Sequence, residues 1–477
     1  MPKPKVSLLS HDDIEKVHEA SLRLLEEVGV YIDNEEALKL LKEEGVNIEG
    51  KVAKIPRDLV NKCLKSTPST FKLYYRDSKD YLIIGNKGTI FNPGSAAIKI
   101  LDYNKGEPRE PFFKDLVDFS ILVDALEYIN AQSTALVPAD VPVEIRDRVR
   151  LYPILKFSNK PIITGAFTIE GVHDMKAMLE IVNRDIAKKP IAIFDVCPSP
   201  PLQWSNLTMQ NLIDCARYGI PVEIIPMPQL GATAPVTLAG ALIQHNVEAL
   251  TGIVIAQLVR RGTPVIYGGS PCLFDMRWGT SCISTPETLL LTLAYTEIGK
   301  YYNIPTHAYV GLSDAKIIDY QAGVETLVGA LLAVLKGINI ASGPGMLEFE
   351  SLQSMEKIVL DNDICGIVFR IAKGFEIHEE TLAIDLIRSV GPGGHFLSKK
   401  HTLKWFRIEE FFPKIFDRST KRENILRKAH ERVNEILERH KPESLPPDIE
   451  RELDKFFNNI CKRYGVKTRR QKSYYSP

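Results

Sequence analysis

The stretch "PVEIIPMPQLGATAPVTLAGALIQHNVEALTGIVIAQLVRRGTPVIYGGS", residues 221–270, shows the pattern that recurs along the chain. Two short apolar runs, residues 221–228 and 263–270, flank a long apolar segment of helical length, residues 237–262. Strands that are apolar on both faces and separated by helix-length connections are typical of parallel β/α units. This stretch therefore predicts one strand–helix–strand unit whose strands are covered on both faces.

Apolar runs of this kind occur eight times. They are "GTIFNPGS" (88–95), "STALVPAD" (133–140), "PIITGAF" (161–167), "PIAIFDVCP" (190–198), "PVEIIPMP" (221–228), "TPVIYGGS" (263–270), "PTHAYVGLSD" (305–314) and "INIASGPG" (338–345). Eight parallel strands with intervening helices can close on themselves, so we expect an α/β fold with a (β/α)8 TIM barrel as catalytic domain over residues 86–400. Residues 1–85 should form an N-terminal helical cap with short strands, and residues 401–477 a C-terminal helical extension.

Composition excludes several functional classes. The 60 Lys and Arg residues balance the 60 Asp and Glu residues, so no basic field favours nucleic acid or an anionic membrane as a partner. We find neither a signal-peptide core nor an apolar run long enough to span a bilayer. The seven cysteines are scattered without a C-x-x-C pair, which argues against a disulfide framework or a structural zinc site. We therefore expect a cytoplasmic protein.

Small and polar residues follow several of the apolar runs. In a barrel, the loops at the carboxyl ends of the strands build the active site. The segments "FNPGS", "FDVCPSP", "PMPQLGATAP", "YGGSPCLFDMRWG", "YVGLSDAK" and "SGPGM" should then face one mouth. Any one of them is explained equally well as a turn, but six at strand ends favour a site.

Several long segments resemble the trimethylamine methyltransferase superfamily. They are "PVEIIPMPQLGATAPVTLAGALIQHNVEALTGIVIAQL", "FDMRWGT", "YVGLSDAKIIDYQAG", "GPGMLEFESLQSMEKIVLDNDI" and "GPGGHFL". The resemblance implies a methyltransferase on a (β/α)8 scaffold that moves a methyl group from a methylated amine to the cobalt(I) of a corrinoid. A separate corrinoid-binding protein carries that corrinoid, which implies that no cofactor is tightly bound to this chain. We expect that partner to dock over the mouth, and we expect a homo-oligomer.

One position departs from the family pattern. Superfamily enzymes that use trimethylamine carry pyrrolysine just before an "SDAK" segment, and Leu312 stands at the corresponding position here. The chain therefore resembles the branch that contains glycine betaine:corrinoid methyltransferases. A quaternary ammonium leaves as a neutral amine and needs no proton, whereas a tertiary amine must first be protonated or otherwise activated. This difference favours a quaternary ammonium such as glycine betaine as the methyl donor.

Aromatic rings and carboxylates at the strand ends are the groups that hold a quaternary cation. We predict a catalytic set of Leu312, Asp314, Gln321 and His395, and a substrate-binding set of Phe91, Asn92, Phe274, Asp275, Arg277, Trp278, Tyr309, Glu348 and Phe396. Leu312 would give the N-methyl groups an apolar wall. Arg277 would either bind the carboxylate of a betaine or form a surface ion pair. The "GPGGHF" stretch (391–396) would either be a turn or bring His395 to the mouth.

Three other readings remain open. A zinc-dependent methyl-donor:corrinoid methyltransferase would need three of Cys197, Cys272, Cys282 and His307 to converge on one ion. In the second reading, a protein without pyrrolysine only binds small cationic ligands. An aldolase-type barrel would use Lys316 for a Schiff base.

Overall fold

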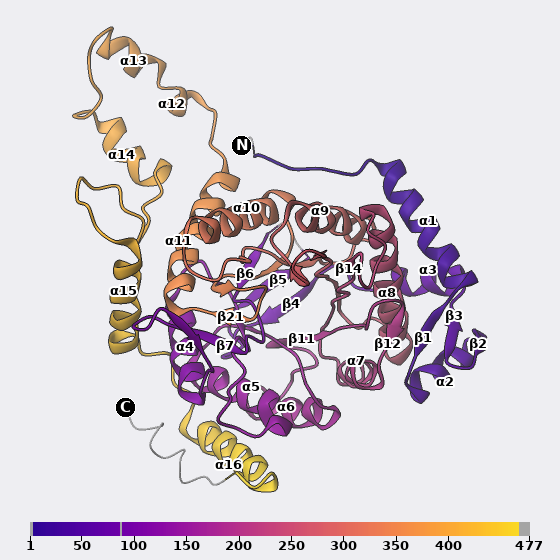
Figure 1. The fold of residues 1–477 in the computed structure, drawn as a ribbon. Helices are drawn as coiled ribbons and strands as arrows, with labels where there is room; N and C mark the ends of the chain where they lie inside the picture. The colour runs from indigo at the N-terminus through magenta and orange to yellow at the C-terminus, as the bar shows by residue number, and fades with distance from the viewer. Residues whose placement is uncertain (1–2, 86–87, 467–477) are drawn as a thin grey trace.

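The computed structural model describes residues 3–85 and 88–466 and shows a mixed α/β fold (Figure 1). Eight short strands are all parallel to their neighbours. They are β6 (Ile90–Asn92), β9 (Gln132–Ser133), β10 (Ile162–Thr164), β11 (Ala192–Val196), β13 (Val222–Ile224), β15 (Val265–Tyr267), β18 (His307–Tyr309) and β19 (Ile340–Ser342). Five of them form the sheet β15-β13-β11-β10-β9, and three form the sheet β18-β19-β6.

The two sheets are linked at both of their edges. A parallel bridge joins Tyr267, at the end of β15, to Thr306, directly before β18. At the other edge, the carbonyl of Phe91 in β6 accepts a hydrogen bond of 3.2 Å from the amide of Ala131, directly before β9. The strand order therefore follows the chain order around both sheets.

Each predicted apolar run contains or begins with one of these strands. The run 133–140 fits least well, because β9 covers only its first residue. Residues from 134 onward leave the ladder, and a parallel bridge pairs Leu136 with Ala97 instead.

Helices surround the strands, as Figure 1 shows. They are α4 (Phe113–Ala125), α5 (Arg146–Phe157, after the 3-10 turn η1, Val143–Ile145), α6 (Ile169–Val182), α7 (Asn206–Tyr218), α8 (Leu238–Val259), α9 (Pro286–Tyr301), α10 (Tyr320–Lys336) and α11 (Met355–Lys373). Helix α8 is long and apolar enough to cross a membrane, but 78% of its apolar window is buried inside the protein. Helices of the core of water-soluble proteins have the same property, so α8 is weak support for a membrane segment.

The loops that follow the parallel strands contain further short strands. One small sheet has the order β14 (Gln229–Leu230), β16 (Cys272–Asp275) and β17 (Thr280–Cys282). Another has the order β20 (Met346–Leu347), β21 (Leu352–Gln353), β7 (Lys99–Asp102) and β8 (Glu107–Arg109). These sheets stiffen the loops at the carboxyl ends of the strands.

A hairpin covers the amino ends of the parallel strands. It consists of β4 (Phe71–Tyr74) and β5 (Tyr81–Ile84). Its Leu73 and Ile84 belong to an apolar cluster with residues near the beginning of six parallel strands: Ile90, Ala131, Ile163, Ile193, Ile266 and Ile340. This cluster fills the amino ends, so the carboxyl ends are the place where a ligand could enter.

The N-terminal helices pack against α8. They are α1 (His11–Glu27), α2 (Glu35–Glu43) and α3 (Arg57–Ser66). The strands β1 (Val30–Ile32), β2 (Asn47–Glu49) and β3 (Val52–Lys54) lie between these helices in sequence. Strand β1 also pairs with β12 (Gln203–Trp204), which lies between β11 and α7. The predicted N-terminal segment thus shares a sheet with the region that follows it.

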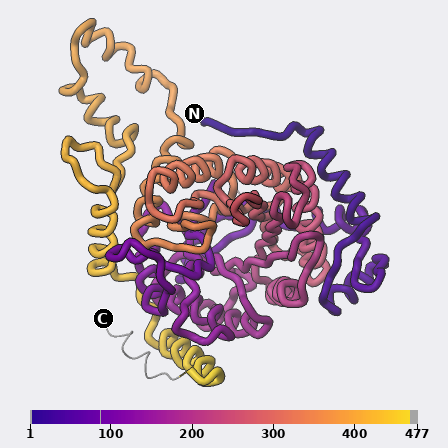
Figure 2. The backbone as a smooth tube through the Cα atoms, in the orientation of Figure 1, coloured from indigo at the N-terminus to yellow at the C-terminus, as the bar shows by residue number. Residues whose placement is uncertain are grey.

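The C-terminal elements form two groups. Helices α15 (Ile425–Arg439) and α16 (Pro447–Arg463) lie against the body, where α15 packs on α11 and α16 on α6. Before them, α12 (Glu379–Leu382), α13 (Ile384–Val390) and α14 (Lys400–Glu409) belong to a segment that projects from the body in both views (Figures 1 and 2). The last part of the predicted extension, residues 467–477, lies outside the described residues.

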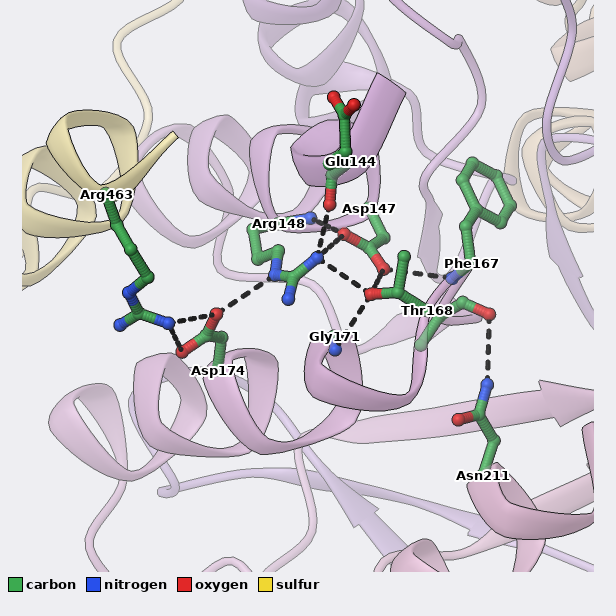
Figure 3. A network of polar contacts seen from close by, with 10 residues as sticks. Glu144, Asp147, Arg148, Phe167, Thr168, Gly171, Asp174, Asn211 and Arg463 are labelled. Atoms are coloured by element: carbon green, nitrogen blue, oxygen red, sulfur yellow. Dashed lines mark hydrogen bonds and ion pairs between the residues drawn. The ribbon is translucent and has the colours of Figure 1, made fainter. Parts of the chain in front are cut away.

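A buried arginine connects α5, α6 and α16 (Figure 3). Arg148, whose side chain is fully buried, donates through Nε to Asp174 at 3.1 Å and through Nη1 to Asp147 at 3.0 Å. The same Nη1 donates to the hydroxyl of Thr168 at 2.8 Å. Arg463, at the end of α16, approaches Asp174 from the other side at 3.3 Å. The buried carboxylates are therefore compensated mainly by Arg148.

We expect Arg148→Met to lower the free energy of unfolding by about 3–5 kcal/mol, because Asp147 and Asp174 would lose the buried cation that compensates them. Arg463→Met is the matched control. The Arg463 side chain is 54% exposed, so its loss should cost less than about 1 kcal/mol. Urea unfolding of both variants checks this expectation, and equal losses would contradict it.

Candidate functional site

Next to the apolar cluster, toward the carboxyl ends of the strands, the inward-facing side chains change from apolar to polar within two residues. Because side chains alternate between the two faces of a strand, the residue two positions after an inward-facing isoleucine also faces inward. These residues are Asn92 after Ile90, Asp195 after Ile193, Gly268 after Ile266 and Ser342 after Ile340. The carboxyl ends of the strands therefore enclose a layer of polar side chains.

Two carboxyl groups lie side by side in this layer. Asp195 in β11 and Glu223 in β13 are register partners on neighbouring parallel strands. If both were ionised, Asp195 Oδ1 and both oxygens of Glu223 would be buried without a hydrogen-bond donor. Burial raises the pKa of both groups, and their mutual contact raises the pKa of Glu223 further while lowering that of Asp195. Glu223 therefore stays protonated, and its O–H donates a hydrogen bond to the carboxylate of Asp195.

His307 in β18 continues this polar chain. Its Nδ1 lies 3.3 Å from Glu223 Oε1, and its Nε2 lies 2.9 Å from the hydroxyl of Ser342. That hydroxyl donates to Asn92 Oδ1 at 2.9 Å, so it accepts the proton of Nε2. Burial lowers the pKa of His307 to about 3, so the ring is neutral. Gly268 makes room for this ring, because a Cβ there would lie 3.1 Å from His307 Nδ1.

Arg150 brings a positive charge to the same layer. It lies on α5, is 1% exposed, and its guanidinium is 4.5 Å from the ring of Phe167. Its Nη2 donates to the hydroxyl of Thr134 at 2.7 Å, but its Nη1 has no partner. Burial lowers the pKa of Arg150 to about 10, and the charge of Asp195 opposes this shift. The arginine is therefore still charged at neutral pH.

A strained turn supplies a third carboxyl group. Glu348, Phe349 and Glu350 have φ values of 50°, 57° and 66°. Side chains other than glycine rarely adopt this left-handed region, and each such residue costs on the order of 1 kcal/mol or more. The turn places Glu350 near Asp195, whose charge, together with burial, raises the pKa of Glu350 well above its ordinary value. Its Oε1 has no partner.

Part of this cluster can be reached by solvent. Asp195, Tyr309 and Glu350 keep intermediate exposure, although the protein surrounds them closely enough to shift their pKa values upward. Tyr309 also hydrogen-bonds to Asp195 and thereby favours its ionised form. These three side chains form the accessible wall of the cluster, while Glu223 and His307 lie behind them, fully buried.

Only two of the predicted site residues take part in this cluster. Tyr309 lies in its accessible wall, and Asn92 ends the chain of hydrogen bonds behind it. Phe91, by contrast, is fully buried and packs edge-on against Phe369 of α11, with ring centroids 5.3 Å apart. Neighbouring residues on a strand face opposite sides, which explains why Phe91 and Asn92 differ.

The predicted residues around the "SDAK" segment serve the loops. Leu312 is 1% exposed, in the loop after β18. The carboxylate of Asp314 accepts hydrogen bonds from the amides of Ile283 and Ser284 at 3.0 and 2.9 Å, so it holds the segment before α9. Gln321 is exposed on the first turn of α10, where it donates to Glu325 at 2.8 Å.

The remaining predicted residues lie further out. Arg277 is paired with Asp275 on the β16–β17 hairpin and its side chain is 81% exposed, which matches the surface ion pair among our two readings. The same hairpin carries Phe274, which is half-buried, and Trp278, which is 78% exposed. Glu348 is ion-paired with Lys99 at 3.1 Å.

His395 and Phe396 lie between α13 and α14, in the projecting segment. Both are exposed, and the structure does not bring them to the mouth of their own chain. Of the two readings of "GPGGHF", the structure shows the turn, because the chain leaves the body after α11 and returns only near residue 409.

The alternative metal and Schiff-base sites are not assembled. Within residues 3–85 and 88–466, Cys197, Cys272, Cys282 and His307 do not bring three ligand atoms close enough to hold one ion. Burial raises the pKa of the Cys272 thiol to about 12, which opposes the thiolate that zinc requires. Lys316 is exposed, donates to the carbonyl of Asp314 at 2.8 Å and stacks its ammonium 3.8 Å from the ring of Phe349.

With this geometry established, comparison with known proteins gives the family. Residues 1–464 match trimethylamine methyltransferase (MTTB). The chain belongs to this family. It is 33% identical over 473 residues to the glycine betaine methyltransferase of Desulfitobacterium hafniense (strain Y51), covering 97% of this chain and 98% of that protein. It is also 33% identical over 480 residues to the trimethylamine methyltransferase MttB of Methanosarcina barkeri (strain Fusaro), covering 96% of each.

A solved structure resembles the fold. The monomethylamine methyltransferase of Methanosarcina barkeri superposes with a TM-score of 0.54 at 13% identity, covering 91% of this chain and 88% of that one. At this identity the likeness supports the fold alone. Family membership nevertheless makes this protein a methyltransferase, so the family resemblance predicted from the sequence is confirmed.

Sequence reasoning missed Asp195, Glu223, Arg150 and Glu350, and took His307 as a core or barrel-lining residue, or as a ligand in the zinc alternative. A signal for two of them was present in the sequence. "FDV" and "VEI" place an acid inside an otherwise apolar strand, where an ionised carboxylate is costly unless something compensates it. Arg150 and Glu350 carry no such signal, because a helix and a loop bring them in.

The proton on Glu223 has a measurable consequence for stability. The unfolded chain ionises this carboxyl near its ordinary pKa of 4.5, whereas the folded chain keeps it protonated. The folded state thus binds more protons above pH 4.5, and stability falls as pH rises. We expect Glu223→Gln to flatten this decrease between pH 5 and 8 and to be more stable than the native protein at pH 8. Urea unfolding at several pH values measures this, and a less stable variant at pH 8 would contradict a protonated Glu223.

Proposed function

We propose that this protein transfers a methyl group from a quaternary ammonium compound, glycine betaine or another betaine, to the cobalt(I) of a corrinoid carried by a separate protein. The glycine betaine methyltransferase of D. hafniense supports the donor, because it matches nearly the whole chain. The single structural observation that carries the proposal is the polar cluster. Asp195 contacts Glu223 there and interacts with Glu350 and Arg150, and carboxyl oxygens without donors line the cluster.

A closed (β/α)8 barrel is the scaffold that we propose for this site. The Tyr267–Thr306 bridge and the hydrogen bond from Ala131 to Phe91 support closure, because they connect the two sheets at both edges. The eight helices around the strands are consistent with the same architecture. Within it we place a catalytic domain at residues 86–373, shorter than the predicted 86–400, because α11 ends at Lys373.

A cation without N–H groups cannot donate a hydrogen bond, so it is held by charge and by aromatic faces. Ionised Asp195 and the ring of Tyr309 offer both in the accessible wall of the cluster. Glu223 stays protonated and donates a hydrogen bond to Asp195, which favours the ionised form of Asp195, and the apolar cluster below excludes water. Arg150 provides a positive charge for the carboxylate of a betaine, and it is better placed than Arg277, which Asp275 already occupies.

The reaction needs positioning more than acid or base chemistry. The cobalt(I) of the partner supplies the electron pair that binds the methyl carbon, and the C–N bond breaks with its pair on nitrogen. The amine leaves neutral, so no side chain has to deliver a proton. The residues of this chain hold the methyl group in line with the nucleophile and replace water around the cation. Leu312 is the residue that we propose in place of pyrrolysine.

The docking surface for the partner is an apolar rim. Eight exposed apolar side chains occupy the connections that lead from parallel strands to helices: Ile98, Phe112, Val143, Phe167, Val236, Met276, Trp278 and Ile317. Large exposed apolar patches mark interaction sites, and these surround the carboxyl ends where the cluster opens. A corrinoid protein that docks there would bring its cobalt to the cluster. The seven cysteines all lie within the described residues and form no disulfide, which is consistent with a reducing cytoplasm as the location.

We expect Asp195→Asn to weaken glycine betaine binding at least about tenfold, because one charge near the cation contributes more than about 1.4 kcal/mol at the effective dielectric of such sites. Asp275→Asn is the matched control, since it removes the same charge from the hairpin outside the cluster. Isothermal titration with glycine betaine measures both. Equal affinities for the two variants would remove Asp195 from the proposed site.

Docking at the rim is tested separately. We expect Trp278→Ser to raise the KM for the corrinoid protein roughly tenfold, as for a central aromatic residue of an interface, and to leave glycine betaine affinity unchanged. Ile83→Ser, on β5 at the opposite end of the strands, is equally conservative toward the fold because Ile83 is 49% exposed. It should change neither value. Methyl transfer measured at several partner concentrations decides, and an unchanged KM in Trp278→Ser argues against this rim.

A further inference from the structure

The projecting segment is attached to the body only at its base. We call residues 375–412 the arm. It leaves after α11, and Arg370 of that helix holds Glu409 near its return, with Nη2 to Oε2 at 2.8 Å. Beyond it, the carboxylate of Asp363 accepts hydrogen bonds from the amides of Ile415 and Phe416 at 2.6 and 3.0 Å. The arm thus starts and ends at fixed points of the same helix.

The arm cannot be stable by its own contacts. Its helices α12, α13 and α14 have 4, 7 and 10 residues, and none contains a buried residue. Helices this short are unstable in water unless they pack against something. Ten of the arm's large apolar side chains are exposed: Phe375, Ile377, Leu382, Ile384, Ile387, Phe396, Leu397, Leu403, Ile408 and Phe412. A surface must therefore cover the arm when it is ordered.

The body of the same chain has a second uncovered apolar surface. Helix α10 has the composition of a buried helix, "YQAGVETLVGALLAVLK", with only Glu325 and Lys336 charged. Yet Tyr320, Val324, Leu327 and Val328 are exposed, at the spacing of one helix face. A helix that is apolar on all sides is normally buried. We call these four residues the α10 strip.

We propose that the arm of one protomer covers the α10 strip of a second copy, so that the protein is an oligomer built by reciprocal exchange of arms. The two surfaces suit one another in chemistry, because each exposes large apolar side chains, and charged side chains of the arm form ion pairs within it. They also lie near one another on the chain, since the arm leaves from α11, which packs along α10. In a symmetric pair, the arm of each protomer covers the strip of the other, so both arms and both strips are covered.

The exposed area of the arm is sufficient for such an interface. Ten large apolar side chains, about half exposed, present roughly 900 Å², if each has on the order of 150–200 Å² to bury. A specific interface typically buries about 800 Å² on each partner. The arm therefore offers the area that one partner contributes to such an interface, and the α10 strip is the part of the second copy that we assign to it.

The experiment compares the mass in solution of the native chain with that of variants, by sedimentation velocity. The native protein should sediment as an oligomer. Leu397→Asp with Leu403→Asp in the arm, and Leu327→Asp with Val328→Asp in the strip, should each shift it to the monomer. Val143→Asp is the matched control, because Val143 is 64% exposed on the rim and lies in neither surface. All positions are exposed, and circular dichroism verifies that each variant is folded.

Mixing the arm variant with the strip variant distinguishes this contact from any other. The mixture contains one intact arm and one intact strip, so it should form a dimer that neither variant forms alone. A monomeric native protein overturns the proposal. Dissociation by only one of the two variants, or a mixture that stays monomeric, would also overturn the assignment of the arm to the strip.

Discussion

The register between β11 and β13 is the constraint on which the site depends. Parallel strands that are covered on both faces normally carry apolar rather than charged side chains. In this chain, isoleucines occupy the amino ends of most parallel strands. Asp195 and Glu223 break the rule on directly opposed positions. A slip of one residue between the strands would turn one carboxyl group away from the other and leave it ionised in an apolar wall. Their contact therefore ties the geometry of the sheet to the charge of the site.

The proton between the carboxyl groups of Asp195 and Glu223 determines the charge of the cluster. With Glu223 protonated and His307 neutral, the ionised Asp195 and the charged Arg150 interact with one another. Such a site attracts a ligand that carries both charges close together more than it attracts a simple cation. A betaine is a ligand of this kind, whereas trimethylammonium supplies only the positive half. The charges of the cluster and the leucine at the pyrrolysine position thus both favour a betaine over trimethylamine as the methyl donor, although the two arguments start from different residues.

The parts that could be predicted from the sequence are those with a local signal. Apolar runs gave the positions of the strands, since burial on both faces leaves no room for alternation. The run 133–140 was placed too late along the chain, because its residues pair with Ala97 outside the main ladder. Tyr309 and Asn92 were found because they lie on strands. Arg150 and Glu350 were missed, because a helix and a strained turn bring them to the site and neither leaves a pattern.

The "GPGGHF" stretch shows why the sequence left two readings of His395 open. A motif that follows the last apolar unit in sequence need not lie next to it in space, because a loop with two fixed ends can hold its tip far from its base. Gly391 and Gly393 have φ values of 69° and 78°, so the tip between α13 and α14 depends on residues that tolerate this region. The helices next to this tip bury no side chain within their own chain, so contacts inside the chain do not explain its shape. A second surface that packs against the tip would explain it, and this is the physical reason to look for that surface on a second copy.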